Sequence, residues 1–137
     1  MWFQTLPEEL RARCRLHGRV SREEALELMT RARVVLAPSL SDGVPNSMYE
    51  AMAAGALPLV SPLDTIRPLV EEGRNVLFAR NLYPGEIADA LARALTDDAL
   101  VDSAAEENLA LVRRVADRAE IRTRVVAFYE SLAARDA

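Results

Sequence analysis

The sequence predicts a single α/β domain over residues 1–137, a Rossmann-like three-layer domain with a parallel sheet of about four strands. Three observations predict this fold. Short apolar runs alternate with helical periods between residues 14 and 96, which is typical of parallel βαβ units with right-handed crossovers. Several of these runs are apolar on both faces, as in a sheet that helices cover on both sides. From Asp97 onward the periodicity is entirely helical, which gives a helical C-terminal third that covers one side of the sheet.

Composition and charge exclude several classes of protein. The chain is 50% hydrophobic and 28% charged, which is enough for one buried core and too apolar for intrinsic disorder. A net charge of −4 makes the chain a poor general binder of nucleic acid, which needs a basic face, so we expect no such partner. Cys14 and His17, the only Cys and His, cannot build a disulfide framework or a conventional metal cluster, and we expect no metal or cofactor. No apolar run reaches the roughly 20 residues that span a bilayer, and the start lacks a secretory signal, so we expect a cytoplasmic protein.

The first elements follow from turn residues, a cap and apolar runs. Residues 14–18 are predicted as a short strand that a glycine closes. A helix over about 22–32 begins at a capping box, in which Ser21 and Glu24 satisfy each other's backbone amides. Residues 34–38, apolar on both faces, are predicted as the second strand.

The middle of the chain continues the alternation. Residues 39–45 are predicted as a loop, because Ser, Asp, Gly and Pro are dense there. A helix over about 46–54 ends at a glycine and precedes a strand at 57–60. A short helix over 64–73, capped by its first aspartate, then leads to a strand at 75–78.

Only helices are predicted beyond this strand. Pro84 suits the first turn of a helix whose apolar residues recur every three to four positions. A further helical segment follows from Asp97, and a last helix covers about 118–134.

The loop after the second predicted strand is the candidate ligand site, since ligands of parallel sheets bind beyond the carboxyl ends of the strands. Asp42 and Gly43 open a tight turn, and the amides and dipole of the helix that follows attract anions such as phosphate. Glu50, one turn into that helix, can accept hydrogen bonds from sugar hydroxyls. Two ordinary interpretations stay open. Ser47 and Glu50 also have the spacing of a capping box, and Asp42 also suits an ordinary turn.

A longer motif surrounds these residues. It runs VVLAPSLSDGVPNSMYEAMAAGALPLVSP and is followed by VEEGRNVLFAR and PGEIADALARAL, all between Val34 and Leu95. This stretch resembles the nucleotide-sugar-binding half of the glycosyltransferase group 1 family. The hallmark of that family is a pair of acids with seven residues between them, the second opening a Glu-Ala-Met-Ala-x-Gly run. Residues 50–55 match that run, and the first acid falls on Asp42, where family members usually carry Glu.

The resemblance implies a GT-B fold, in which two Rossmann-like domains face each other across a cleft, and a retaining glycosyltransferase of the hexosyltransferase type. Asp42 would be the catalytic residue beside the transferred sugar, and Glu50 would bind the ribose hydroxyls. His17 is expected to be a strand residue rather than a ligand. The other substrate-binding residues implied are Gly43, Val44, Pro45 and Asn46 at the diphosphate, Ser47 next to them, and Gly18, Arg19 and Val20 beside the nucleotide base.

The implied partners are a nucleotide diphosphate sugar and an N-terminal acceptor-binding domain. Family enzymes are much longer and neutralise the donor diphosphate with an Arg and a Lys early in this half, whereas this chain has no Lys. We therefore expect a truncated donor-binding domain, inactive alone, with any peripheral membrane contact made through the missing half. The alternative is a non-catalytic binding or interaction module on the same scaffold. A flavodoxin-like or receiver-like domain would need an acidic cluster or a phosphate loop after the first strand, and neither is visible.

Overall fold

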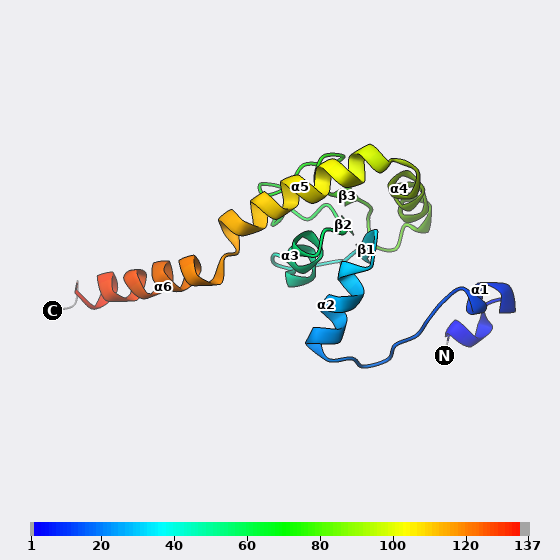
Figure 1. Cartoon of the computed structure of the whole chain (residues 1–137), viewed down its shortest axis with the longest axis horizontal. Coiled ribbons are helices and arrows are strands. Elements are labelled where there is room, and N and C mark those ends of the chain that lie inside the picture. The colour runs from blue at the N-terminus through cyan, green and yellow to red at the C-terminus, as the bar shows by residue number, and fades with distance from the viewer. Residues whose placement is uncertain (1, 135–137) are drawn as a thin grey trace.

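Three short parallel strands form the sheet: β1 (Val34–Ala37), β2 (Leu57–Val60) and β3 (Leu77–Phe78), in that spatial order. The computed structural model describes residues 2–134, and Figure 1 shows how the helices surround the strands. β1 pairs with the full length of β2, whereas β3 pairs only with Leu59 and Val60 of β2. The predicted parallel α/β class is confirmed, with three strands in place of about four.

The helices carry most of the remaining chain. They are η1 (Trp2–Thr5), α1 (Glu8–Ala12), α2 (Arg22–Thr30), α3 (Asn46–Ala53), α4 (Pro84–Thr96), α5 (Asp98–Val115) and α6 (Arg118–Ala133). The predicted capping box at the start of α2 is present. The amide of Glu24 donates to the Ser21 hydroxyl at 3.2 Å, and the Ser21 amide donates to the Glu24 carboxylate at 2.8 Å.

Two apolar clusters lie on opposite faces of the sheet, because successive side chains of a strand point to opposite sides. Leu57 and Leu59 of β2 pack in one cluster with residues of α4 and the first half of α5. Val60 belongs to the other cluster, with Met48 and Met52 of α3. Every residue of β2 is buried. The central strand therefore joins two helical layers, which is the three-layer arrangement that the sequence predicts.

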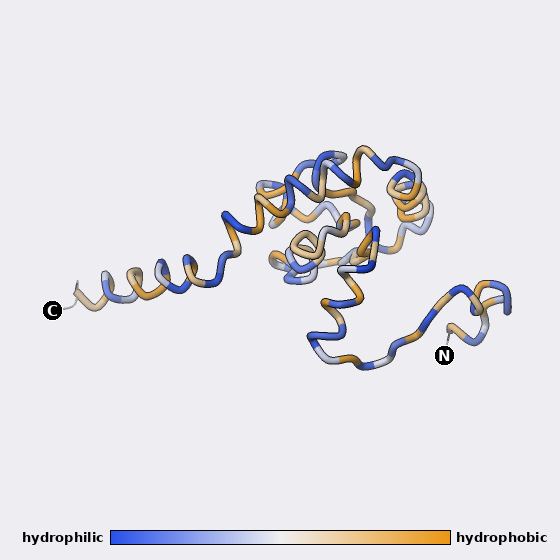
Figure 2. Tube along the Cα trace, viewed as in Figure 1, coloured by the Kyte–Doolittle hydropathy of each residue, from blue (hydrophilic) through white to orange (hydrophobic). Residues whose placement is uncertain are grey.

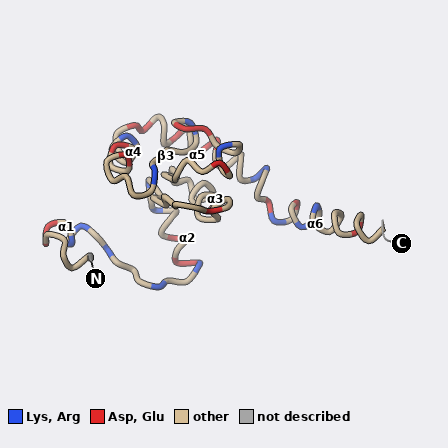
Figure 3. The backbone as a smooth tube through the Cα atoms, turned by 180° about the vertical axis from the view of Figure 1, so that it is seen from behind, with Lys and Arg blue, Asp and Glu red and all other residues tan. Residues whose placement is uncertain are grey.

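Both ends of the chain project from this core. Figure 2 shows hydrophobic residues along α6 although the helix runs away from the sheet, and none of its residues is buried. The expectation that the whole helical tail covers the sheet is thus wrong for α6. Within residues 97–134, α5 supplies the residues that pack in the two apolar clusters. The segment between α1 and α2 is exposed and carries several arginines (Figure 3). No helix within residues 2–134 has the length and apolar character needed to cross a membrane.

Two predicted elements do not form. Residues 14–18 are an exposed extended segment, not a strand, and Leu16 is 59% exposed. This segment has too few apolar side chains to be held against the core, and it pairs with no strand in the described chain. Residues 64–69 are turns instead of a helix. Pro68 explains the second difference, because an interior proline lacks the N–H and clashes with the preceding turn of a helix.

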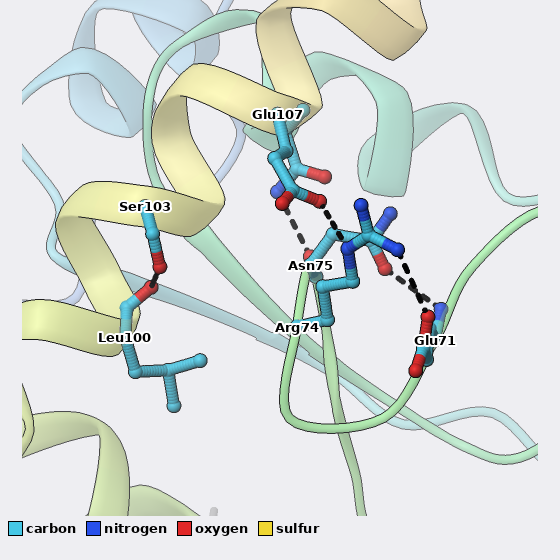
Figure 4. Close-up of polar contacts among 7 residues, drawn as sticks. Glu71, Arg74, Asn75, Leu100, Ser103 and Glu107 are labelled. Carbon is cyan, nitrogen blue, oxygen red and sulfur yellow. Dashed lines mark hydrogen bonds and ion pairs between the residues drawn. The ribbon is translucent and has the colours of Figure 1, made fainter.

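A polar cluster fastens α5 to the loop before β3 (Figure 4). Arg74 donates through Nε to Glu107 of α5 at 2.7 Å and through Nη1 to Glu71 at 3.3 Å. These two carboxylates raise the pKa of Arg74. Beneath them, the fully buried Asn108 donates through Nδ2 to the carbonyl oxygen of Asn75 at 2.8 Å. The cluster fixes the loop on the helix, and the Oδ1 atom of Asn108 has no partner among the described residues.

Candidate functional site

The loop of residues 38–45 connects the carboxyl end of β1 to the start of α3. Its first carbonyl, that of Pro38, accepts a hydrogen bond from Nδ2 of Asn81 at 2.8 Å. The backbone N–H of Asn81 donates to the hydroxyl of the buried Ser61 at 3.2 Å. Asn81 follows β3 and Ser61 follows β2, so these bonds tie together the carboxyl ends of all three strands. The candidate loop therefore begins on a fixed base, at the edge where ligands of parallel sheets bind.

The turn at Asp42 and Gly43 is exposed and is held from one side. The hydroxyl of Thr65 donates to the carbonyl oxygen of Gly43 at 2.7 Å and lies 3.3 Å from that of Asp42. The carboxylate of Asp42 makes no hydrogen bond or ion pair among the described residues, so it lacks the side-chain-to-backbone bond of an Asx turn. The acid that the sequence singles out is free to meet a ligand.

Gly43 has no structural reason to be glycine within the described chain. Its φ angle lies outside the left-handed region, and a Cβ atom added there would meet nothing within 4 Å. Glycine in a loop otherwise serves close approach of a ligand to the backbone. The open space beside Gly43 fits that use.

Helix α3 begins without a side-chain cap. Its N-cap is the buried Pro45, which offers no polar side chain, and no side chain bonds the amides of the first turn. Ser47 is the second residue of the helix rather than its cap. The capping-box interpretation of Ser47 and Glu50 is therefore wrong. The uncapped amides and the helix dipole leave this end of α3 favourable for an anion.

Glu50 instead faces α2. Its Oε1 atom accepts a hydrogen bond from Nη2 of Arg22 at 3.4 Å, and the Arg22 side chain is 74% exposed. Such an exposed pair contributes about 0–1 kcal/mol. Since a carboxylate has several acceptor positions, this contact leaves most of the capacity of Glu50 unused.

Glu50 lines a cleft of about 750 Å³ between α2, α3 and the junction of α5 with α6. Asn46, at the start of α3, lines the same cleft, and Leu26, Val112 and Val115 supply apolar walls. Tyr49 contributes a half-buried ring, and burial raises the pKa of its hydroxyl. The volume and the mixture of apolar walls with a few polar groups are typical of small-ligand sites.

The structure brings together only part of the predicted site. Asn46 and Glu50 share the cleft, whereas Asp42 and Gly43 lie in the turn outside it. Residues 18–20 belong to the segment that leads into α2, where Gly18 has φ +66° and only Val20 is partly buried. Contact with α3 comes instead from Arg22, the first residue of α2, which bonds to Glu50.

Arg80, at the carboxyl edge of the sheet, is already paired with a carboxylate. Arg80, just beyond β3, donates through Nε to Glu86 at 2.9 Å, and its guanidinium lies 3.9 Å from the centre of the Tyr83 ring. This pairing lowers the pKa of Glu86. Arg80 is thus occupied by the start of α4 and is a poor candidate for binding a phosphate.

Sequence reasoning missed two residues that shape the site, Thr65 and Arg22. Both act on the candidate loop or helix from more than twenty positions away in the chain. Thr65 was missed because a helix was predicted over 64–73, where the structure has turns. The second lies in a correctly predicted helix, but its contact depends on how α2 packs against α3, which no local pattern reveals.

Residues 2–97, most of the chain, match the profile of the family described as Glycosyl transferases group 1. The chain belongs to this family. Among curated proteins none matches it. Family membership confirms the resemblance seen in the motif from Asp42 to Gly55 and excludes an unrelated flavodoxin-like or receiver-like domain.

Solved structures place this group 1 glycosyltransferase chain on the GT-B scaffold. Sucrose-phosphate synthase from Thermosynechococcus elongatus matches with a TM-score of 0.85 and 21% identity, over 93% of this chain and 32% of that one. HepE from Anabaena, in complex with UDP-glucose, matches with a TM-score of 0.72 and 20% identity, over 77% of this chain and 29% of that one. The C-terminal domain of the group 1 family protein LpcC from Francisella tularensis matches with a TM-score of 0.66 and 17% identity, over 75% and 53%. This chain thus spans about a third of the length of the first two proteins, and the likeness shows the Rossmann-like fold.

Proposed function

We propose that this chain is the nucleotide-sugar-binding portion of a retaining glycosyltransferase, which transfers a hexose from a nucleotide diphosphate sugar to an acceptor. The observation that carries the proposal is the position of Glu50. It does not cap its helix, and it lines a cleft of about 750 Å³ beside Asn46, at the start of α3. A carboxylate in that position is suited to accept hydrogen bonds from the two ribose hydroxyls of a nucleotide.

The roles of the neighbouring residues follow from the same placement. The diphosphate lies against Gly43, Val44, Pro45 and Asn46, where the uncapped start of α3 and the backbone N–H groups of the three residues other than Pro45 favour negative charge. Asp42 faces the transferred sugar. As the bond between the anomeric carbon and the diphosphate breaks, positive charge develops on the sugar ring, and a nearby carboxylate stabilises it. The oxygen of the acceptor hydroxyl then bonds to the anomeric carbon on the face that the diphosphate leaves, and the hydroxyl proton passes to the departing diphosphate. An N-terminal acceptor-binding domain completes the enzyme and faces this domain across the interdomain cleft of the GT-B fold.

A titration followed by ¹H–¹⁵N NMR tests the proposal on the whole chain. UDP-, GDP- and ADP-glucose serve as probes, and we expect one of them to shift the amides of Gly43, Val44, Asn46 and Glu50. With no lysine in the chain, we expect a Kd of roughly 1 mM, which corresponds to about −4 kcal/mol. Shifts confined to other residues, or no shift with any probe, would overturn the proposal and favour an interaction module. Glu106→Gln on the exposed face of α5 is the control, and it should titrate like the unmodified chain.

A further inference from the structure

Thr65 connects two loops at the carboxyl edge of the sheet. Its hydroxyl donates to the carbonyl oxygen of Gly43 at 2.7 Å, and the carbonyl oxygen of Asp42 lies 3.3 Å away. Thr65 comes from the segment after β2, whereas Asp42 and Gly43 come from the loop after β1. One side chain therefore holds two consecutive peptide groups of the candidate site.

The position of Thr65 is itself fixed by the core. Its neighbour Ile66 is fully buried and packs in the same apolar cluster as Met48 and Met52 of α3. The amides of Ile66 and Arg67 both donate to the carbonyl oxygen of Leu63, at 3.1 and 3.2 Å, which closes the turn around Thr65. The hydroxyl thus reaches Gly43 from a segment that Ile66 anchors in the apolar cluster shared with α3.

This contact sets the direction of an amide group. In a planar trans peptide the C=O and the N–H point in opposite directions. Since the carbonyl of Gly43 points to Thr65, the N–H of Val44, which belongs to the same peptide, points away from Thr65. The position that a side chain would occupy at Gly43 is also open, because a Cβ atom there would meet nothing within 4 Å.

We infer that Thr65 is a positioning residue for the donor diphosphate. It holds the peptide between Gly43 and Val44 so that the amide is already turned outward, next to the uncapped start of α3, before the anion binds. The inference rests on the proposed function, since it assigns the anion at this amide to the diphosphate of a nucleotide sugar. Preorganisation of this kind strengthens binding by removing the cost of ordering the loop.

The experiment compares Thr65→Val with Thr65→Ser by NMR, using the glucose nucleotide that binds the unmodified chain as the probe. Valine keeps the shape of the side chain and removes the hydroxyl, whereas serine keeps the hydroxyl. We expect Thr65→Val to move the amide resonances of Gly43 and Val44 before any nucleotide is added. It should then weaken the Kd about five-fold, the equivalent of one ordinary hydrogen bond. Thr65→Ser should bind within about two-fold of the unmodified chain, a difference well below one such hydrogen bond. Thr123→Val, which removes a hydroxyl bonded to the carbonyl of Ala119 within α6, is the matched control.

Gly43→Ala separates this inference from the proposed function, because its methyl group enters the open space that the diphosphate is proposed to use. If Gly43→Ala weakens binding and Thr65→Val does not, the inference is overturned while the proposed function stands. Failure of serine to restore binding would also overturn it, since the effect would then come from shape and not from the hydroxyl. If the unmodified chain binds none of the three nucleotides, or if neither variant matters, the proposed function and the inference fail together.

Discussion

Replacing Glu50 by glutamine separates its structural contribution from its proposed binding role. Among residues 2–134, the charge of Glu50 contacts only Arg22, at 3.4 Å, with the Arg22 side chain 74% and the Glu50 side chain 29% exposed. An exposed pair of this kind contributes about 0.5 kcal/mol. For a chain of this size, that loss lowers the unfolding temperature by roughly 2 °C. Stability should therefore change little.

Donor binding should change more. A hydrogen bond to a charged group contributes about 1.5–3 kcal/mol, and a neutral one about 0.5–1.5 kcal/mol. If the carboxylate of Glu50 accepts from two ribose hydroxyls, Glu50→Gln should cost about 1–2 kcal/mol, which is roughly 5- to 30-fold in Kd. NMR titration with the glucose nucleotide that binds, together with thermal unfolding, measures both effects. A Kd within two-fold of the unmodified chain would remove Glu50 from the ligand contacts. A decrease of several degrees in the unfolding temperature would show that Glu50 stabilises the fold by more than its contact with Arg22. Glu106→Gln is the matched control for the change of charge.

Three further predictions concern stability. Ser21→Ala should cost about 1 kcal/mol in urea unfolding because it removes the cap of α2, whereas Ser47→Ala should stay within about 0.5 kcal/mol; equal losses would show that Ser47 caps α3 after all. Asn108→Ala should cost at least about 1–3 kcal/mol, because it leaves the buried carbonyl of Asn75 unpaired; a neutral result in the same assay would refute that accounting. The hydrogen bonds from Ser21 lower the pKa of Glu24 below its ordinary value of 4.5, so their stabilisation is complete above that pH and disappears as the pH falls through the folded-state pKa. Thermal unfolding across this acidic range should therefore show a smaller loss in Glu24→Gln than in the unmodified chain, and parallel curves would contradict the assignment.

The sequence predicted the features that depend on neighbouring residues. The strand at 57–60 and the capping box at Ser21 are short-range patterns, and both form where expected. The strand at 14–18 failed because a strand also needs a partner and apolar surface to bury, and Leu16 remains 59% exposed. The helix at 64–73 failed for a local reason that was readable in advance, the proline at position 68.

The candidate site shows the same division. The loop at Asp42 and Gly43 and the helix after it follow from local composition, and the acid pair was identified by its resemblance to the motif of the glycosyltransferase group 1 family. The capping box that the spacing of Ser47 and Glu50 also suggested does not form. The same spacing is compatible with a helix that begins at Asn46, one residue before Ser47. The contact of Thr65 with Gly43 joins positions 22 residues apart and exists only once the apolar cluster under Ile66 has formed. Such contacts depend on tertiary packing and cannot be predicted from a short stretch of sequence.

The constraint on this loop bears on the acid at position 42. Asp is shorter than the Glu usual in the family by one carbon–carbon bond, about 1.5 Å. A mobile loop would recover that distance by moving its backbone toward the sugar. Here Thr65 holds the carbonyl groups of Asp42 and Gly43, and the buried Pro45 holds the other end of the turn. If the chain binds a nucleotide sugar as proposed, we expect the donor to lie closer to the backbone, and the open space beside Gly43 leaves room for it. Under the proposed function Asp42, Gly43 and Thr65 therefore act together, and we expect a change to any one of them to alter how the other two contact the donor.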